Sequence, residues 1–348
     1  MRSDPPPAPR PGRNVIRLLL GLGTAAAAVG VGLIAVQQFR AREAQAEMLA
    51  TPAPIDGARA YKYLKQICDL GPRVAGTEAN TKQRQLVAAH FKKNGATLTE
   101  QPFTGNDPRS GAVVSMVNLV GAWHPDRRNR VVIGAHYDTR PFPDEERDPA
   151  KRKLPFLGAN DGASGVALLM EIANHLEKLN TTWGVDLVIF DGEEIVYGAG
   201  QNQEGEYFLG SKEFSRKYDI AVQNRSIRYR YEAGFVLDMV GDKDLTIDQE
   251  ENSMNLAPGL VRAVWRVAAQ LKVKAFRNRA GLAISDDHLP MNNAGIPTID
   301  IIDFQYGGRD NPNWHSTGDV PENCSAASLE DVGKVVTGWL TQPRRTTR

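Results

Sequence analysis

Glu193 and Glu194 form an adjacent pair of carboxylates at the end of an apolar run, in the sequence VDLVIFDGEE. The run Leu187 to Phe190 is uninterrupted, which is typical of a strand buried on both faces of a sheet. Open α/β sheets carry their chemistry at the carboxyl ends of such strands. Adjacent residues point in different directions, so one carboxylate can bind a metal while the other faces a substrate as a base. A solvated acidic turn is the plain alternative.

Four further segments place metal-binding side chains at predicted strand or loop ends. His136 and Asp138 follow the apolar run VVIGA, and their H-x-D spacing sends both to the same side of an extended chain. Asp161 lies in GANDGASG before a helix, Asp238 ends FVLD, and His315 lies in NPNWHS. Each alone has a structural explanation as a cap, turn or packing residue. Together these imidazoles and carboxylates indicate Zn²⁺ or a similar borderline metal.

The segments that must position these residues alternate between strands and helices. The alternation predicts an α/β fold of three layers, in which helices cover both faces of a central mixed, mostly parallel sheet. We expect helices over 57–70, 81–94, 164–179 and 258–271, and strands over 97–103, 113–122, 130–135, 185–191, 235–239 and 298–302.

The N-terminus differs in kind from the rest of the chain. Residues 1–15 are rich in Pro and Arg, and the stretch Leu18 to Val36 carries no charge and is long enough to span a bilayer. A cleaved signal peptide is the alternative, because Ala44-Gln45-Ala46 has small residues at the right alternation. We expect a cytoplasmic tail over 1–15, a transmembrane signal anchor over 16–36, a linker over 37–56 and a catalytic domain over 57–343.

Composition sets broad limits on function. The chain has 348 residues and a formal net charge of +1, and its basic residues are scattered, so the sequence shows no basic surface for binding nucleic acid.

The arginines before the predicted anchor place the catalytic domain on the extracytoplasmic side of the membrane, periplasmic or extracellular. Cys68 and Cys324 would then lie in an oxidising compartment and could pair. His90 and His175 fall in predicted helices with no acidic partner in register, and His124 lies in a polar turn, so all three are expected at the surface.

The motifs HYD, GANDGASG, FDGEE, LDMVG and WHS, in this order, resemble the M28 family of zinc aminopeptidases and the related glutaminyl-peptide cyclotransferases. The resemblance covers roughly residues 58–340. Two details favour the cyclase: the segment SDDHLP, and Trp314 directly before His315. One detail opposes it, because many animal cyclases carry a Trp soon after the EE pair, where this chain has only Tyr197.

The resemblance implies a role for each matching residue. Asp161, Glu194 and His315 would bind one catalytic zinc, and Glu193 would be the general acid and base. Asp238 would form a hydrogen-bonded couple with Asp286 or Asp287, more readily the first. In a dinuclear peptidase, His136 and Asp238 would instead hold a second zinc that Asp161 bridges. The substrate, a peptide or protein N-terminus, would meet a pocket lined by Trp314, Phe304 and Tyr197.

Two functions of this family remain open at this point, and two from other classes are weaker. A cyclase would convert N-terminal glutamine to pyroglutamate with one zinc, and an aminopeptidase would hydrolyse N-terminal residues with one or two. A receptor-like domain that kept the fold and lost its metal would lack several of these positions, all of which are present. A calcium module is disfavoured because two candidate ligands are histidines, and Ca²⁺ takes oxygen.

Overall fold

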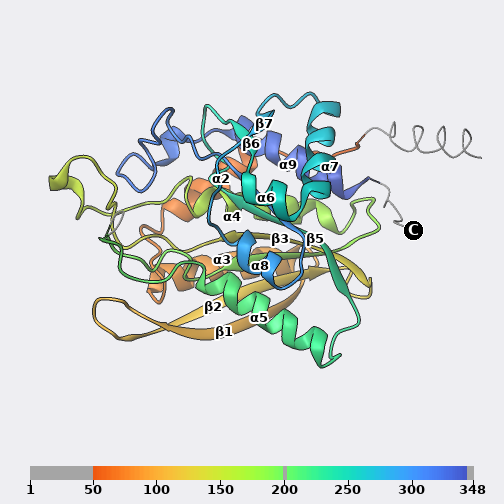
Figure 1. Ribbon diagram of the computed structural model, residues 1–348, viewed down its shortest axis with the longest axis horizontal. Coiled ribbons are helices and arrows are strands. Elements are labelled where there is room, and N and C mark those ends of the chain that lie inside the picture. Colours follow the sequence, from red (N-terminus) through yellow and green to blue (C-terminus); the bar gives the residue numbers. More distant parts are fainter. Residues whose placement is uncertain (1–49, 199–201, 343–348) are drawn as a thin grey trace, which may run out of the picture. The chain divides into compact units, whose positions relative to one another are not determined.

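A six-stranded mixed sheet forms the centre of the computed structural model, which describes residues 50–198 and 202–342. The strands lie in the order β1-β2-β4-β3-β5-β8 (Figure 1). β4, β3, β5 and β8 pair in parallel, whereas β2 pairs antiparallel with both β4 and β1. The predicted α/β fold with a mixed sheet is therefore confirmed. The strands are β1 (Thr97–Asn106), β2 (Val113–Trp123), β3 (Asn129–His136), β4 (Gly184–Phe190), β5 (Arg230–Asp238) and β8 (Thr298–Ile302).

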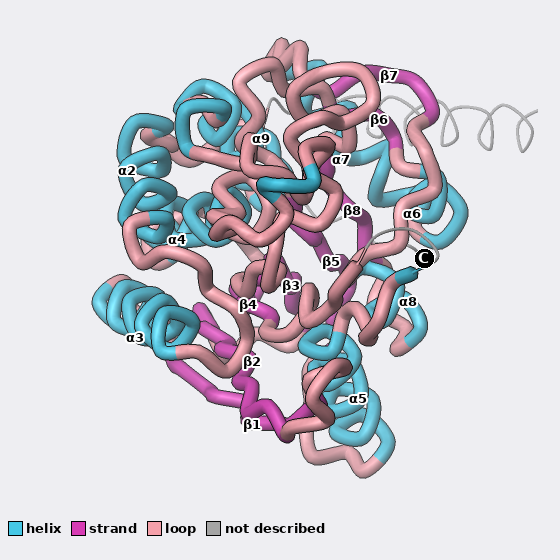
Figure 2. The backbone as a smooth tube through the Cα atoms, turned by 90° about the vertical axis from the view of Figure 1, so that its left-hand side faces the viewer, coloured by secondary structure: helices cyan, strands magenta, loops and turns pink. Residues whose placement is uncertain are grey.

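Helices cover both faces of the sheet, and Figure 2 shows α2, α3 and α4 on one side of the strands and α5 and α8 on the other. Alternate residues of β4 explain the uninterrupted apolar run, because Leu187 and Ile189 join one core and Val188 and Phe190 join the other. The helices are α2 (Gly57–Cys68), α3 (Glu78–Lys93), α4 (Ala163–Leu176), α5 (Leu209–Gln223), α6 (Glu251–Leu256), α7 (Pro258–Gln270), α8 (His288–Asn293) and α9 (Ala326–Leu340).

Short elements complete the described chain. β6 and β7 pair with each other in a separate two-stranded sheet. Two single turns of 3₁₀ helix lie in the long loops that follow β3 and β8. These elements are β6 (Ile247–Gln249), β7 (Phe276–Ala280), η1 (Pro149–Lys151) and η3 (Pro321–Asn323).

Several element boundaries differ from those predicted. α3 begins at Glu78 rather than at Thr81, because the Thr77 side chain caps the helix by accepting the Asn80 N–H. No helix was predicted over α5 or α9. In α9 the buried apolar residues nevertheless recur at helical spacing, which is the signal that predicts a helix: Leu329, Val332, Val335, Val336 and Leu340.

Residues 50–56 pack on the domain and do not form the predicted linker. Ala50, Ala53 and Ile55 are buried, and the Ala53 N–H donates to Thr337 Oγ1 of α9 at 3.1 Å. The folded domain therefore includes this segment. The tail predicted over 1–15 and the anchor predicted over 16–36 lie outside the described residues. Among the described residues, no helix is long and apolar enough to cross a membrane.

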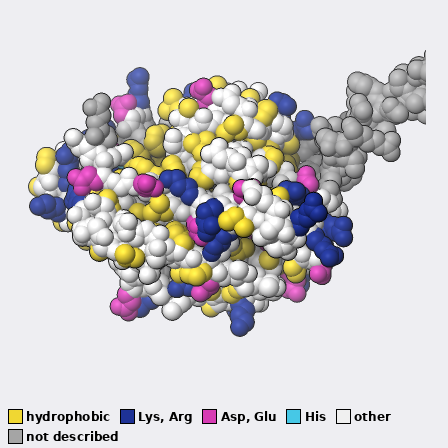
Figure 3. Space-filling view, turned by 60° about the horizontal axis from the view of Figure 1, so that its bottom comes forward, with side chains coloured by type: hydrophobic (Ala, Val, Ile, Leu, Met, Phe, Trp, Pro, Cys, Tyr) yellow, Lys and Arg dark blue, Asp and Glu magenta, His cyan; other side chains and the backbone are white. Residues whose placement is uncertain are grey.

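The surface charge and the two cysteines test two further predictions, scattered basic residues and a possible disulfide. On the face that Figure 3 shows, basic and acidic side chains of the described residues are interspersed. Cys68 and Cys324 are both buried and free, so the disulfide that the sequence left open is not formed.

Candidate active site and metal centre

The carboxyl ends of the three central strands bring the predicted residues together. β3 lies between β4 and β5, and all three run in parallel. His136 is the last residue of β3, Asp238 is the last residue of β5, and Glu193 and Glu194 follow β4. Asp161 precedes α4. One edge of the sheet therefore gathers the imidazole and carboxylates, as parallel pairing requires.

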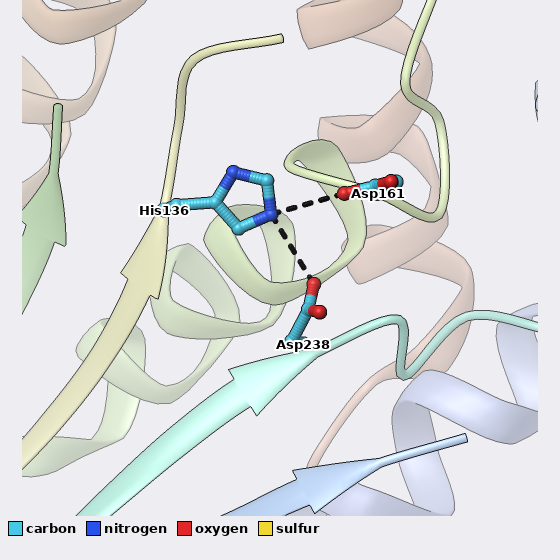
Figure 4. A group of neighbouring side chains, drawn as sticks. All are labelled: His136, Asp161 and Asp238. Atoms are coloured by element: carbon cyan, nitrogen blue, oxygen red, sulfur yellow. Dashed lines mark hydrogen bonds and ion pairs between the residues drawn. The ribbon is translucent and has the colours of Figure 1, made fainter. Parts of the chain in front are cut away.

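Asp161 lies at the centre of the group and faces two histidines. Its Oδ1 is 3.1 Å from His136 Nε2, and its Oδ2 is 3.2 Å from His315 Nε2. His136 Nε2 also lies 3.2 Å from Asp238 Oδ1, so this ring points between two carboxylates (Figure 4). Burial alone would raise the pKa of Asp161, but the bonds with His136 and His315 outweigh it and lower the pKa. Asp161 is thus held as a carboxylate, the form that binds metal.

Glu194 and His315 face each other on the other side of Asp161. Glu194 Oε1 lies 2.7 Å from His315 Nε2, and both side chains are buried. Glu194 Oε2 accepts the backbone N–H of Arg140 at 3.1 Å, and the Arg140 guanidinium lies 3.5 Å from Oε1. Arg140 is itself fixed by Asp144 and by the Tyr207 hydroxyl. The Glu194 carboxylate is therefore aimed at His315 and Asp161 by a buried cation.

Two buried carboxylates fix the backbone of the candidate ligands. Asp138 accepts the N–H groups of Glu193 and Glu194, at 3.0 and 2.9 Å. Asp319 accepts the N–H of Asp161 at 3.1 Å and that of Asn160 at 2.7 Å. Asp138, the acidic residue of the H-x-D motif, therefore fixes the turn that carries Glu193 and Glu194. It belongs to none of the candidate metal-binding groups among the described residues. Neighbouring polar residues orient a metal shell in this way.

The Glu193 carboxylate lies beside the same residues and accepts no hydrogen bond within the described part of the chain. Its Oε2 lies 4.0 Å from His136 Nδ1. Burial, with the nearby Glu194, Asp287 and Asp286 carboxylates, raises the pKa of Glu193 well above its usual value, although His136 opposes this. A carboxyl whose pKa is raised in this way can hold and return a proton near neutral pH.

The predicted hydrogen bond between Asp238 and the Asp286-Asp287 pair is not formed. Asp287 instead accepts the Ser211 hydroxyl of α5, and Asp286 Oδ1 accepts the Asp287 N–H. The Asp238 and Asp286 carboxyls still interact by charge, because each raises the cost of ionising its neighbour. Burial, with Asp286 among the neighbours, raises the pKa of Asp238 to about 7. The choice between Asp286 and Asp287 for a role beside the substrate stays a prediction.

Two of the three predicted pocket residues form an aromatic wall. The Trp314 ring stacks on His315 with centroids 3.7 Å apart, and Phe304 meets Trp314 edge-on at 5.1 Å. Tyr197 is not brought to this wall. Its hydroxyl donates to Asp107 in the loop between β1 and β2, and its described contacts include neither Trp314 nor Phe304.

The donor set fits a zinc ion at Asp161, Glu194 and His315. One nitrogen and two carboxylate donors match the ligands that catalytic zinc takes, with a further position left open. Donor atoms about 3.3 Å apart would surround a tetrahedral ion with bonds of about 2 Å, and the measured separations of 2.7 and 3.2 Å from His315 Nε2 are close to this. Asp161 Oδ2 is buried and its close neighbour is the His315 ring, a fellow candidate ligand 3.2 Å away, as expected of an atom that shares a cation with it.

A second group of donors lies beside the first. His136, Asp161 and Asp238 also place one ligand atom each within 4.8 Å of one another. Asp161 belongs to both groups, so it could bridge two ions. Zinc remains the best match for either group because each combines imidazole with carboxylate.

Comparison with known proteins identifies the family. The sequence profile of peptidase family M28 matches residues 118–340. The chain belongs to peptidase family M28. Its computed fold is similar to the crystal structure of Fimbriiglobus ruber glutaminyl cyclase, with a TM-score of 0.80, 38% identity, and coverage of 84% of this chain and 97% of that one.

Other M28-like proteins show a similar relationship. The crystal structure of a leucine aminopeptidase precursor from Bacteroides thetaiotaomicron gives a TM-score of 0.76 at 32% identity, covering 85% of this chain and all of the other. The Bos taurus glutaminyl-peptide cyclotransferase is 24% identical over 250 residues, and the match spans 64% of each chain. The predicted resemblance to this family and to its cyclases is confirmed.

Sequence reasoning missed or misread several residues around the M28 site. Arg140 and Asp319 belong to no motif, and a buried charged residue with a structural role looks the same in sequence as a charged residue at the surface. His288, in the DDH motif, proves to be fully buried among Asp286, Asp300 and Glu250.

The three histidines expected at the surface are half-buried and bonded. His90 and His124 pair with the carbonyls of Met170 and Leu176. His175 has the acidic partner that the sequence analysis overlooked, because Glu171 lies one turn before it with its carboxylate 3.0 Å away. These contacts are structural, and none of the three rings lies among the candidate ligands.

Proposed function

We propose that the protein is a zinc-dependent glutaminyl-peptide cyclotransferase, which converts N-terminal glutamine to pyroglutamate and releases ammonia. The observation that carries the proposal is the aromatic wall of Trp314 stacked on His315. It closes one side of the site beside a candidate zinc ligand, where a glutamine side chain can fold back over its own amine. The similarity to Fimbriiglobus ruber glutaminyl cyclase supports the proposal.

The proposed reaction needs one proton to move between two nitrogens. The α-amine attacks the carbon of the side-chain amide, a carbon–nitrogen bond forms, and the bond to the amide nitrogen breaks. Zinc, when bound, polarises the amide carbonyl. Glu193 takes the proton from the attacking amine and gives it to the leaving nitrogen, and its raised pKa suits both steps. Asp286 or Asp287 accepts hydrogen bonds from that nitrogen as it becomes ammonia.

We propose one zinc rather than two, held by Asp161, Glu194 and His315. Burial raises the pKa of Asp238, the ligand that a second ion would need, to about 7. A metal ligand must be deprotonated, so a second ion on this side would have to displace that proton at and below neutral pH. His136 then serves to orient Asp161 and Asp238.

Aminopeptidase activity is the second candidate, and one observation favours it. Asp161 faces His136 with one oxygen and His315 with the other, which is the arrangement of a carboxylate that bridges two metals. In that enzyme Glu193 would deprotonate the attacking water.

The two candidates are separated by assaying ammonia release from a Gln-initiated peptide beside leucine release from a Leu-initiated peptide. Enzyme and added zinc are matched in both assays. The proposal expects rapid ammonia release and leucine release at the level of the blank. Rapid leucine release without cyclisation would contradict the proposal and leave the family and the candidate ligands unchanged.

We also propose that residues 16–36 anchor the chain in a membrane with the catalytic domain on the extracytoplasmic side. Support comes from the sequence alone, through the uncharged stretch and the arginines before it. The test compares membrane fractions of cells that express the full chain with those expressing residues 50–348. The full chain should sediment with membranes and the shorter chain should not. Equal partition of both would contradict the anchor.

A further inference from the structure

A groove of about 1000 Å³ is lined by Phe304 and Trp314, the two residues of the aromatic wall. The Trp314 ring, which stacks on His315, therefore contacts both the groove and a candidate ligand. Leu282, which is 66% exposed, adds apolar surface to the groove. A peptide whose first residue occupies the site has its following residues close to this groove. The inference below rests on the proposed function.

Three arginines from separate parts of the chain surround the groove. Arg147 follows β3, Arg279 lies in β7, and Arg309 follows β8. Arg147 and Arg309 are exposed and form no ion pair with any described residue. Three segments distant in sequence thus place guanidinium groups around one opening, where they can reach a bound anion.

Acidic residues in the groove do not cancel these cations. Asp248, which does not line the groove, is shared by Arg277 and Arg279, with contacts of 2.8 and 2.7 Å, so one carboxylate meets two guanidiniums. Glu145 and Asp310 line the groove, but neither forms an ion pair with its arginines in the described chain. Three arginines against two carboxylates leave the lining of the groove positive.

We propose that this groove binds the residues after the N-terminal glutamine and selects peptides that carry a carboxylate at the third residue. The carboxylate belongs either to an Asp or Glu side chain or to the C-terminus of a short peptide. Arg147 and Arg309 bind it, and the apolar floor of Phe304, Trp314 and Leu282 accepts the side chain between it and the glutamine. The groove therefore sets which Gln-initiated peptides are processed fastest.

The size of the effect follows from the exposure of the arginines. An exposed ion pair contributes about 0.2 to 1 kcal/mol, which corresponds to a preference of about 1.4- to 5-fold for each pair. We expect the preference in KM rather than in kcat, because the carboxylate lies outside the reacting centre. Salt at about 0.5 M should weaken it, because exposed charges are screened.

The experiment measures kcat/KM for ammonia release by the full chain on a matched peptide set. Gln-Phe-Glu-Ala amide is compared with Gln-Phe-Gln-Ala amide, which is nearly the same shape without the charge, and with Gln-Phe-Lys-Ala amide. Gln-Phe-Ala with a free C-terminus and its amide test the second source of a carboxylate. The expected order is Glu above Gln above Lys, or a free terminus above its amide.

Variants assign the preference to the groove. The double variant Arg147→Gln/Arg309→Gln should lose it, whereas Arg128→Gln/Arg228→Gln should keep it. Arg128 and Arg228 are also exposed and their substitution removes the same two charges, but they precede β3 and β5, at the opposite end of these strands from the site. Loss of the preference at high salt in the unmodified chain is a second test of the groove, and it does not depend on any variant.

The outcomes separate this inference from the function on which it rests. Ammonia release at equal kcat/KM from all five peptides would overturn the groove proposal and leave the cyclase standing. A preference that persists in the double variant would also overturn it. Absence of ammonia from every peptide would overturn the proposed function itself, and the groove proposal with it.

Discussion

The two sides of Asp161 carry similar donors but differ in what supports them. On one side, Glu194 meets His315, receives the Arg140 N–H, and belongs to a turn that Asp138 fixes. On the other side, His136 meets Asp238, whose side chain is 13% exposed and whose pKa is raised to about 7. The difference teaches that a list of possible ligands does not define a metal site. The surrounding charges decide which carboxylate is ready to bind.

The largest effect is expected from removing a ligand on the supported side. His315→Ala should lose zinc and reduce cyclisation to the level of the blank, because His315 is the only nitrogen donor in that group. Bound zinc is measured by mass spectrometry of the metal content, alongside ammonia release. Retention of one zinc per chain with substantial turnover would show that the metal lies on the other side.

Glu193→Gln should separate chemistry from metal binding. Zinc should stay bound, because Glu193 is not in the supported group, whereas turnover should fall by about 10²- to 10⁴-fold with the loss of the proton carrier. Glu194→Gln is the matched neighbour and should instead weaken zinc binding. Equal zinc loss in the two variants would mean that their roles are assigned wrongly.

Arg140→Gln should weaken zinc binding by about 10- to 100-fold, the usual effect of removing a residue that orients a ligand. Arg140 lies 3.5 Å from Glu194, and its backbone N–H contact survives the substitution. Zinc affinity is measured by competition with a chelator, and Arg228→Gln serves as the control. An unchanged affinity would show that the Arg140 guanidinium does not position the ligand.

His136→Ala is expected to have a smaller effect, which is the sharpest contrast with His315→Ala. The chain should keep one zinc and lose about tenfold in turnover, because on this account His136 orients carboxylates and binds no metal. Zinc content and ammonia release are again compared. A fall in zinc from two per chain to one would instead assign a second metal to this side.

The smallest effect concerns pH and the Asp319 carboxyl beneath Asp161. Burial, with the nearby Asp161, raises the pKa of Asp319 from 3.8 to about 7. The folded state thus binds a proton more tightly than the unfolded state, so this contribution to stability is present below about pH 4 and is lost as the pH rises through about 7. Between about pH 4 and pH 7, the melting temperature of metal-free Asp319→Asn should change less than that of the unmodified metal-free chain. An equal change in the two proteins would exclude Asp319 as the cause.

The sequence alone was sufficient to predict the central strands of the sheet and the candidate site residues at their carboxyl ends. The apolar runs of β3, β4 and β5 carry a strong signal because both faces of these strands are buried. His136, Glu194 and Asp238 lie at or just after the ends of those runs, so their meeting at one edge could be predicted from parallel pairing, whereas Asp161 and His315 reach it from loops. Their order along the chain was enough for the family.

Contacts between distant segments could not be predicted in this way. The Arg140–Glu194 and Asp319–Asp161 contacts depend on how loops fold over the sheet, which no local pattern records. For the same reason, two predictions were wrong. Tyr197 was placed in the substrate pocket but bonds to Asp107, and the hydrogen bond predicted between Asp238 and Asp286 is not formed. Residues 50–56 resembled a linker because the burial of their small side chains depends on α9, which had not been predicted.

The most direct test of a mononuclear cyclase is a zinc titration with two activities read together. Zinc is first removed from the full chain with a chelator and then restored in known equivalents. Ammonia release from a Gln-peptide and leucine release from a Leu-peptide are measured at each point. The account predicts that ammonia release reaches its maximum at one equivalent while leucine release stays at the blank. Leucine release that rises until two equivalents are bound would contradict it.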